Sequence, residues 1–149
     1  MTIHADLYDT DFYAWCEEQA AFLTRQDPWS LDWANLAEEI RSMARRDKRA
    51  LGSHLQGLVM HLLKWRYQPE RRQTGHPWRS TVRNHRQAIS ELTQESPGLT
   101  PVLVDLLAQR YPHAREDAAD DTGLGLDTFP EACPWTVEQI RDEDFWPES

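Results

Sequence analysis

The stretch LDWANLAEEIRSMARRDKRALGSHLQGLVMHLLKWRYQP, residues 31–69, decides the fold. Apolar side chains recur in it every three or four residues, which is the spacing of one face of an α-helix. This stripe consists of Leu36, Ile40, Met43, Leu51, Leu55, Leu58, Leu62 and Trp65. Asp32 is a suitable N-cap, Gln68-Pro69 must end the helix, and the length between them is roughly 50 Å at 1.5 Å per residue. Because that is long for a small chain, we expect a break near residues 46–48, where Asp47 is able to cap a new helix.

Three further helices are predicted around this one. Residues 12–23 share one apolar stripe at helical spacing. Pro77 suits the first turn of a helix that continues to about Ser96, and Pro101 suits the first turn of another that ends at Gly123. No run of alternating β-branched residues predicts a strand. We therefore expect an all-α fold with a four-helix bundle-like core.

The last part of the chain, residues 124–149, has a different composition. Its apolar side chains are scattered among prolines and acids, and they include Leu126, Phe129, Trp135, Ile140, Phe145 and Trp146. Thr136 and Gln139 have the spacing of a capping box, which predicts one short helix. We expect an ordered, aromatic and acidic C-terminal strap that packs on a helical core of residues 1–123. A chain of 149 residues is most often one domain, so 1–149 is predicted to be a single helical domain.

Charge is distributed very unevenly along the chain, whose formal net charge is -9. Residues 41–86 hold 12 of the 16 Lys and Arg and only two acids, which gives this segment a charge of +10. Residues 1–40 and 87–149 hold the other 23 acids. A basic middle between two acidic arms meets either an external anion or the arms themselves.

Cysteine content and hydropathy indicate the cellular compartment in which the protein is expected. Cys16 and Cys133 lie far apart in the sequence, which is typical of a reduced, intracellular protein without a disulfide framework. The acidic N-terminal residues lack the apolar core of a signal peptide. No apolar run approaches the roughly 18 residues that a membrane-spanning helix needs. We expect a soluble, cytoplasmic protein without membrane contact.

The basic middle contains the candidate binding residues. Arginine binds phosphate with two parallel hydrogen bonds, and aromatic rings stack on bases, so Arg and Trp together are typical of anion or nucleic-acid contact. The candidate anion-binding residues are Lys64, Arg71, Arg72, Arg79 and Arg83. The alternative is that these cations pair with the acidic arms of the same chain. We favour this alternative, because a run of charge is more often a paired or solvated face than a nucleic-acid groove.

Histidines and carboxylates provide weaker candidates. His54 and His61 share a helix face, and His85 lies on another predicted helix. Helical bundles build metal sites from inward His and carboxylate side chains, but the Glu-x-x-His and His-Glu-x-x-His spacings are absent. Adjacent Glu38 and Glu39 point about 100° apart on a helix, so they do not share one site. No catalytic residue, metal site or cofactor is predicted.

Five segments together carry a resemblance to a known family. They are YDTDFYAWCEEQAAFL (8–23), NLAEEIRSMARRDKRAL (35–51), HLLKWRYQPERR (61–72), WRSTVRNHRQAI (78–89) and TGLGLDTFPEACPWTVEQIRDEDFWPE (122–148). The chain resembles the bacterial family catalogued as domain of unknown function twenty-nine. This resemblance implies an all-helical bacterial protein. It implies no activity, ligand or catalytic residue, so no functional residue is transferred to this chain.

Two functions from different classes follow from these observations. The first is a non-enzymatic interaction module with an unidentified protein partner or with an anionic partner at the basic middle. The alternative is a metal-dependent or small-molecule enzyme with its site inside the helical bundle. Whether the chain is an enzyme, its partner and its oligomeric state are left open by the sequence.

Overall fold

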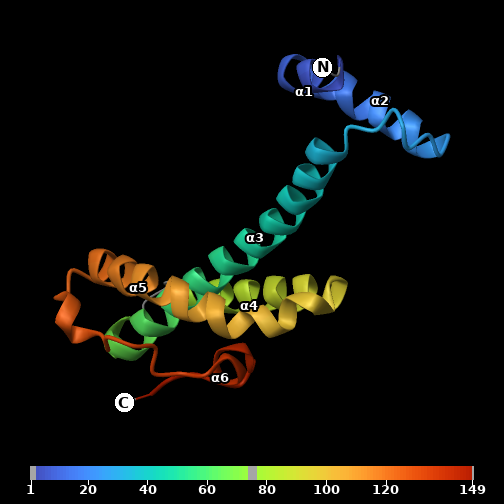
Figure 1. The fold of residues 1–149 in the computed structure, drawn as a ribbon. Coiled ribbons are helices and arrows are strands. Elements are labelled where there is room, and N and C mark those ends of the chain that lie inside the picture. Colours follow the sequence, from blue (N-terminus) through green and yellow to red (C-terminus); the bar gives the residue numbers. More distant parts are fainter. Residues whose placement is uncertain (1–2, 74–76, 149) are drawn as a thin grey trace. The chain divides into compact units, whose positions relative to one another are not determined.

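The computed structural model describes residues 3–73 and 77–148, with side chains from residue 7 onward (Figure 1). Every regular element in these residues is a helix, and none is a strand, so the predicted all-α, bundle-like fold is confirmed. The α-helices are α1 (Ile3–Thr10), α2 (Phe12–Thr24), α3 (Trp33–Tyr67), α4 (Trp78–Glu95), α5 (Leu103–Thr122) and α6 (Val137–Arg141). Three short 3-10 helices are η1 (Pro69–Arg71), η2 (Pro97–Val102) and η3 (Leu126–Thr128).

The chain divides into two compact units, unit 1 (residues 1–46) and unit 2 (residues 47–149). The boundary lies within α3, so residues 33–46 of this helix belong to unit 1 and residues 47–67 to unit 2. The organisation of 1–149 as a single domain stays a prediction. The two units are described separately.

The break expected near residues 46–48 is wrong, because α3 is one uninterrupted helix. Around Asp47 the chain consists of arginine, lysine and alanine, which are good helix formers, and a single Asp lowers helix propensity by only a few tenths of a kcal/mol. The two glycines of α3 lie where other side chains approach the helix too closely to leave room for a Cβ atom. A Cβ atom on Gly52 would lie 2.8 Å from Arg110 Nε, and one on Gly57 would lie 2.6 Å from His85 Nε2.

In unit 1, hydrogen bonds connect α2 to the start of α3. Asp11 caps α2, and its carboxylate accepts a hydrogen bond from Ala14 N at 3.0 Å. Trp15 and Gln19 are the buried residues of α2. Trp15 Nε1 donates to Asp32 Oδ2 at 3.1 Å, and Asp32 N donates to Gln19 Oε1 at 2.8 Å. Asp32 immediately precedes α3. Its two hydrogen bonds therefore attach the start of α3 to α2.

Helix α1 has no counterpart among the predicted helices. It packs on α2 through Tyr8, whose ring lies 4.8 Å from the Trp15 ring and 5.8 Å from the Phe12 ring. The Tyr8 hydroxyl also donates a hydrogen bond to Glu39 of α3. That hydrogen bond raises the pKa of Tyr8 to about 12. A short helix with these tertiary contacts does not need a long apolar stripe of its own.

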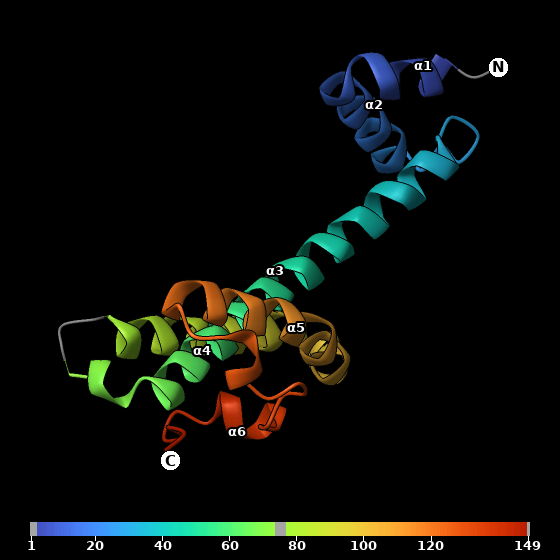
Figure 2. The same cartoon turned by 90° about the vertical axis from the view of Figure 1, so that its left-hand side faces the viewer.

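In unit 2, α4 and α5 lie alongside the second part of α3 (Figures 1 and 2). The core between them is aliphatic and includes Leu51, Leu55, Leu58, Leu62, Val82, Ile89, Leu103, Leu106 and Leu107. Helix α5 passes through Pro112 without ending. It ends at Gly123, as predicted, and this residue has a left-handed φ of +73°, which favours glycine.

The C-terminal strap is an integral part of the unit 2 core. Phe129, Val137 and Ile140 are buried in the same apolar cluster as the helices. The predicted capping box is confirmed, since Thr136 and Gln139 exchange side-chain hydrogen bonds with each other's backbone at the start of α6. Tyr111 of α5 donates its hydroxyl hydrogen bond to the Pro130 carbonyl at 2.6 Å. The strap is therefore anchored by both apolar packing and hydrogen bonds.

Candidate functional site

Helix α4 carries the arginines of the basic middle at the edge of the core. Its buried face contains Val82 and Ile89. Arg86 lies between them on the same face, because residues 82, 86 and 89 are spaced by four and three positions. Arg86 is only 4% exposed, whereas Arg79 and Arg83 are exposed. One arginine of the series has thus become a core residue.

The Arg86 side chain forms hydrogen bonds with backbone carbonyls of the strap. Its Nε donates to the Ile140 carbonyl at 2.7 Å, and its Nη2 donates to the Phe145 carbonyl at 2.7 Å. A longer bond of 3.4 Å joins Nη1 to the Glu143 carbonyl. Burial lowers the pKa of Arg86, but an arginine remains charged in proteins, so these are charge-assisted hydrogen bonds. The guanidinium satisfies carbonyls that would otherwise be left without donors.

Two tryptophan rings and several guanidinium groups lie next to this anchor. The ring of Trp146 from the strap lies 4.6 Å from that of Trp65 on α3. Arg79 Cζ lies 4.7 Å from the Trp65 ring and 4.9 Å from the Trp146 ring. Arg72 Cζ is 5.1 Å from Trp65, and Arg86 Cζ is 5.3 Å from Trp146. These distances are typical of cation–π contacts.

The five predicted anion-binding residues have different surroundings. Lys64 Nζ pairs with Asp121 at 3.1 Å. Arg72 Nε donates to the Trp65 carbonyl at 2.8 Å, and Arg79 stacks on the two tryptophans. Arg71 and Arg83 are exposed. Within the described residues Arg83 has no hydrogen-bond or ion-pair partner.

The structure brings only part of this set together. Arg79 and Arg83 line one pocket of about 240 Å³, which the other three do not reach. The remaining residues of that pocket are Arg86, Glu143, Asp144 and Trp146. Acids of the strap therefore share the pocket with the arginines of α4. Lys64 forms an ion pair with an acid of the same chain, whereas Arg72, Arg79 and Arg86 contact carbonyls and aromatic rings. Pairing of the basic middle with the acidic arms stays a prediction.

Sequence reasoning missed Arg86 and Trp146 as members of this site. Arg86 carries a readable signal, since it interrupts the apolar stripe of its own helix at a buried position. Trp146 has no comparable local signal. Its position depends on the strap returning to α3 across some eighty residues of sequence.

Three histidines form a second cluster between α3 and α4. His54 Nδ1 and His85 Nδ1 lie 3.1 Å apart, which is a hydrogen-bonding distance. The ring of His61 lies 6.1 Å from that of His85, and its Nδ1 donates to the Gly57 carbonyl at 2.8 Å. The His85 ring packs directly against Gly57. The small glycine therefore lets α4 approach α3 at this level.

No group of three or more His, Cys, Asp or Glu within residues 3–73 and 77–148 is arranged to hold a metal ion. Glu38 pairs with Arg45, and Glu39 accepts the hydrogen bond of Tyr8, so the two adjacent carboxylates have separate partners. None of the helices in the described ranges has both the length and the apolarity to cross a membrane.

Comparison with known proteins identifies the family. The family model described as "Domain of unknown function DUF29" matches residues 7–146, which is nearly the whole chain. This chain belongs to that family. The resemblance of the five sequence segments is thereby confirmed. No curated protein and no solved structure matches the chain.

The histidine cluster makes the stability of this DUF29 chain depend on pH. Burial, and to a smaller extent the neighbouring His54 and His61 rings, lowers the pKa of His85 from 6.5 to about 4. Burial also lowers the pKa of His61. Below pH 6.5 the unfolded chain binds a proton at position 85 that the folded chain does not bind until about pH 4. The contribution of neutral His85 to the free energy of unfolding is therefore complete above pH 6.5, and it is lost as the pH falls to about 4.

We expect the urea midpoint of the parent chain to fall more steeply between these pH values than that of a His85→Gln variant. The substitution removes the titrating group and leaves every carboxylate in place, so the difference between the two profiles isolates the histidine contribution. The measurement is a series of urea unfolding curves at several pH values. Parallel profiles would show that His85 does not couple folding to protonation.

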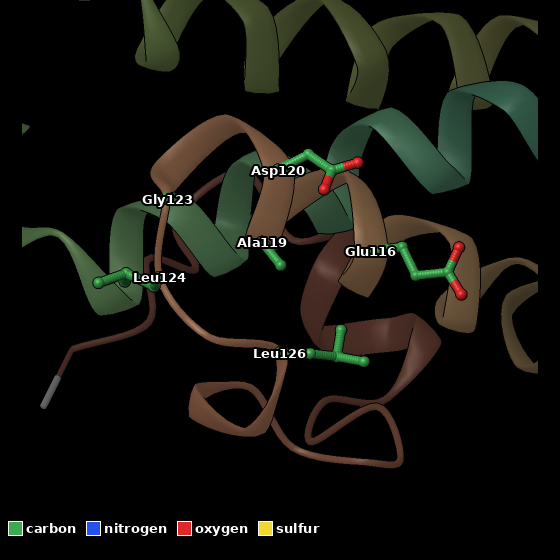
Figure 3. A pocket seen from close by; sticks show the side chains of 6 residues that line it. All are labelled: Glu116, Ala119, Asp120, Gly123, Leu124 and Leu126. Carbon is green, nitrogen blue, oxygen red and sulfur yellow. The ribbon is translucent and has the colours of Figure 1, made fainter.

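A further pocket lies at the end of α5 (Figure 3). It has a volume of about 520 Å³ and is lined by Glu116, Ala119, Asp120, Gly123, Leu124 and Leu126. Figure 3 shows the carboxylates of Glu116 and Asp120 standing apart rather than pointing toward one another. Within the described residues no third His, Cys, Asp or Glu joins them in a group that could hold a metal ion.

Proposed function

We propose that this DUF29 chain is a non-enzymatic interaction module and that its docking surface is an apolar groove of unit 1. The observation that supports this proposal is the exposure of large apolar side chains in unit 1, four of which line the groove. Of nine exposed large hydrophobic residues in the described chain, seven belong to unit 1. They are Phe12, Tyr13, Leu23, Trp29, Trp33, Ile40 and Met43. Apolar surface gathered in this way marks sites of protein interaction.

The groove lies between α2 and the first part of α3. Its volume is about 430 Å³, and nine of its lining residues are Phe12, Trp15, Cys16, Gln19, Ala20, Leu23, Leu36, Ile40 and Met43. Glu39 and Arg46 complete the lining. Ile40 is 66% exposed and Met43 is 59% exposed, although both belong to the apolar stripe of α3. A helical partner with an apolar face fits such a groove better than a small polar ligand does.

Unit 2 gives a contrast within the same chain. There the apolar stripe of α3 is covered by α4, α5 and the strap, and Leu51, Leu55 and Leu58 are fully buried. One helix therefore has a covered apolar stripe in unit 2 and an open one in unit 1. The open part is the surface that a protein partner would cover.

We expect an apolar fluorescent probe, anilinonaphthalene sulfonate, to bind the groove in dilute solution and to become strongly fluorescent. An Ile40→Glu variant should lose more than half of this signal, because the substitution places a charge on an apolar wall while changing an already exposed side chain. Tyr13→Glu is the matched control, since Tyr13 is 76% exposed on the same unit but does not line the groove. Equal fluorescence of all three proteins at a concentration where the chain is monomeric would contradict the proposal.

The basic surface supports a second candidate function, contact with an anionic partner. The predicted contacts are Lys64, Arg71, Arg72, Arg79 and Arg83. The exposed Arg83, which has no partner in the described residues, favours this function. The strap acids Glu143 and Asp144 in the same pocket oppose it, because they repel an incoming anion.

We expect the parent chain not to bind labelled duplex DNA or RNA, even at low salt, because its guanidinium groups hold the strap and acids share their pocket. Titrations at two ionic strengths test this. Binding that weakens with salt, with a slope of about -0.9 per phosphate contacted on duplex DNA, would support the anionic partner instead. An Arg83→Gln variant should then lose about one phosphate contact, which would make the slope less steep by about 0.9.

A further inference from the structure

The apolar groove has a charge pattern that identifies its partner. A two-fold interface uses the same surface patch on both copies, so the patch must complement itself. The groove of unit 1 is apolar along its middle and contains one acid, Glu39, and one base, Arg46. A patch with one charge of each sign pairs with its own rotated copy.

The positions of these charges define an axis. Glu39 and Arg46 lie on α3, seven residues and therefore roughly 10 Å apart. Met43 lies near the midpoint between them and is 59% exposed. If two copies of α3 cross in antiparallel directions at Met43, each Arg46 faces Glu39 of the other copy. Ile40 and Met43 then bury one another across the axis.

The helices on either side of the groove supply its apolar surface. From α2 this surface includes Phe12, Cys16 and Leu23. From α3 it includes Leu36, Ile40 and Met43. In a two-fold pair, α2 of one copy packs against α3 of the other through these apolar residues. The product is a bundle of four helices around the apolar residues of both grooves.

We infer that two copies of this chain associate through the groove of unit 1, around a two-fold axis near Met43. This inference rests on the proposed function and names its partner, a second copy of the same chain. Arg46 is exposed and has no hydrogen bond or ion pair in the described part of unit 1. It is therefore available for Glu39 of the second copy.

Sedimentation equilibrium of the full chain over a range of concentrations is the primary experiment, and it should give the mass of a dimer. Met43→Glu should weaken the dimer about tenfold or more, since it places two carboxylates together at the axis. Its far-UV circular dichroism should match that of the parent, because Met43 is an exposed side chain.

A charge-exchange experiment tests the orientation. Arg46→Glu alone and Glu39→Lys alone should each be monomeric, because like charges face one another in either homodimer. An equimolar mixture of the two variants should form a heterodimer, in which both cross pairs have opposite signs again. Loss of the Tyr8 hydrogen bond in Glu39→Lys does not predict this recovery on mixing. Two variants that stay monomeric when mixed would overturn the antiparallel arrangement.

Cysteine alkylation locates the interface without any substitution. Cys16 lines the groove, and Cys133 lies in unit 2 and is the internal control. Peptide mapping should show that alkylation of Cys16 slows as protein concentration rises, while alkylation of Cys133 does not change. A dimer in which Cys16 reacts equally fast at all concentrations would overturn the inference, because the contact would then lie elsewhere.

The failure of this inference is distinguishable from the failure of the proposed function. If the chain is monomeric at every concentration but still binds the apolar probe at Ile40, the inferred dimer is wrong and the proposed interaction module is still supported. A monomeric chain that does not bind the probe overturns both. A dimer with concentration-dependent protection of Cys16 supports both.

Discussion

Replacement of Arg86 by alanine is expected to lower the free energy of unfolding by about 3–5 kcal/mol. The substitution removes three hydrogen bonds to the strap and leaves the carbonyls of Ile140, Glu143 and Phe145 without their donor. A buried carbonyl that loses its partner costs about 1–3 kcal/mol, and the two shorter bonds, to Ile140 and Phe145, carry most of the expected loss. The Arg86 contact with the Trp146 ring is lost as well. Urea unfolding followed by tryptophan fluorescence measures the effect.

Arg83→Ala is the matched control for this prediction. Both residues lie on α4, so the change in helix propensity is the same, but Arg83 is exposed and has no partner in the described residues. We expect its effect to stay within about 0.5 kcal/mol. Arg86→Lys keeps the charge and loses the forked geometry, so its effect should be intermediate. Equal stability of the Arg86 and Arg83 variants would show that the strap is not held by this side chain.

Local signals predicted most of the helical fold. Prolines and capping residues act within a few positions of themselves, so they can be read without knowledge of the tertiary structure. Pro69 ends the long helix, Gly123 ends α5, and Thr136 caps α6, as the sequence indicated. The continuity of α3 at Asp47 was not predicted. An Asp can cap a new helix, but it does not do so where its neighbours on both sides favour the helical conformation.

The role of the basic middle could be predicted only in part. The sequence showed that cations were concentrated there, and it favoured use within the chain over an external anion. It could not show that Arg86 would bind carbonyls rather than carboxylates, because those carbonyls are more than fifty residues away. The sequence likewise presented the stripe of α3 as uniformly apolar. Which part of it is covered depends on where α4, α5 and the strap pack.

The groove of unit 1 illustrates the same limit. Phe12, Leu23, Ile40 and Met43 have the spacing of core residues, and nothing in the sequence indicates that they are 49% to 66% exposed. Hydrophobic periodicity identifies a face that is to be buried, but it does not say by what. Core residues and interface residues therefore look alike in a single sequence.

Deletion of residues 124–149 is expected to abolish the cooperative unfolding transition of unit 2. The deletion removes Phe129, Val137 and Ile140 from the core, and each buried side chain contributes roughly 1.5–3 kcal/mol. Together they rival the total stability of a typical domain, which is roughly 5–15 kcal/mol. Thermal unfolding monitored by circular dichroism should show a broad transition or aggregation in place of a sharp one.

The same deletion should change the surface chemistry of the basic middle. It removes Glu143 and Asp144 from the arginine pocket and frees Arg86 from its carbonyl partners. We therefore expect the truncated chain to bind polyanions that the full chain ignores, with a steep dependence on salt. A chain that ends at Pro147 is the control, because it keeps the buried strap residues and loses only the terminal two. If the long truncation melts within a degree or two of the parent and binds polyanions no better, the strap contributes neither to the core nor to the neutralisation of the basic surface.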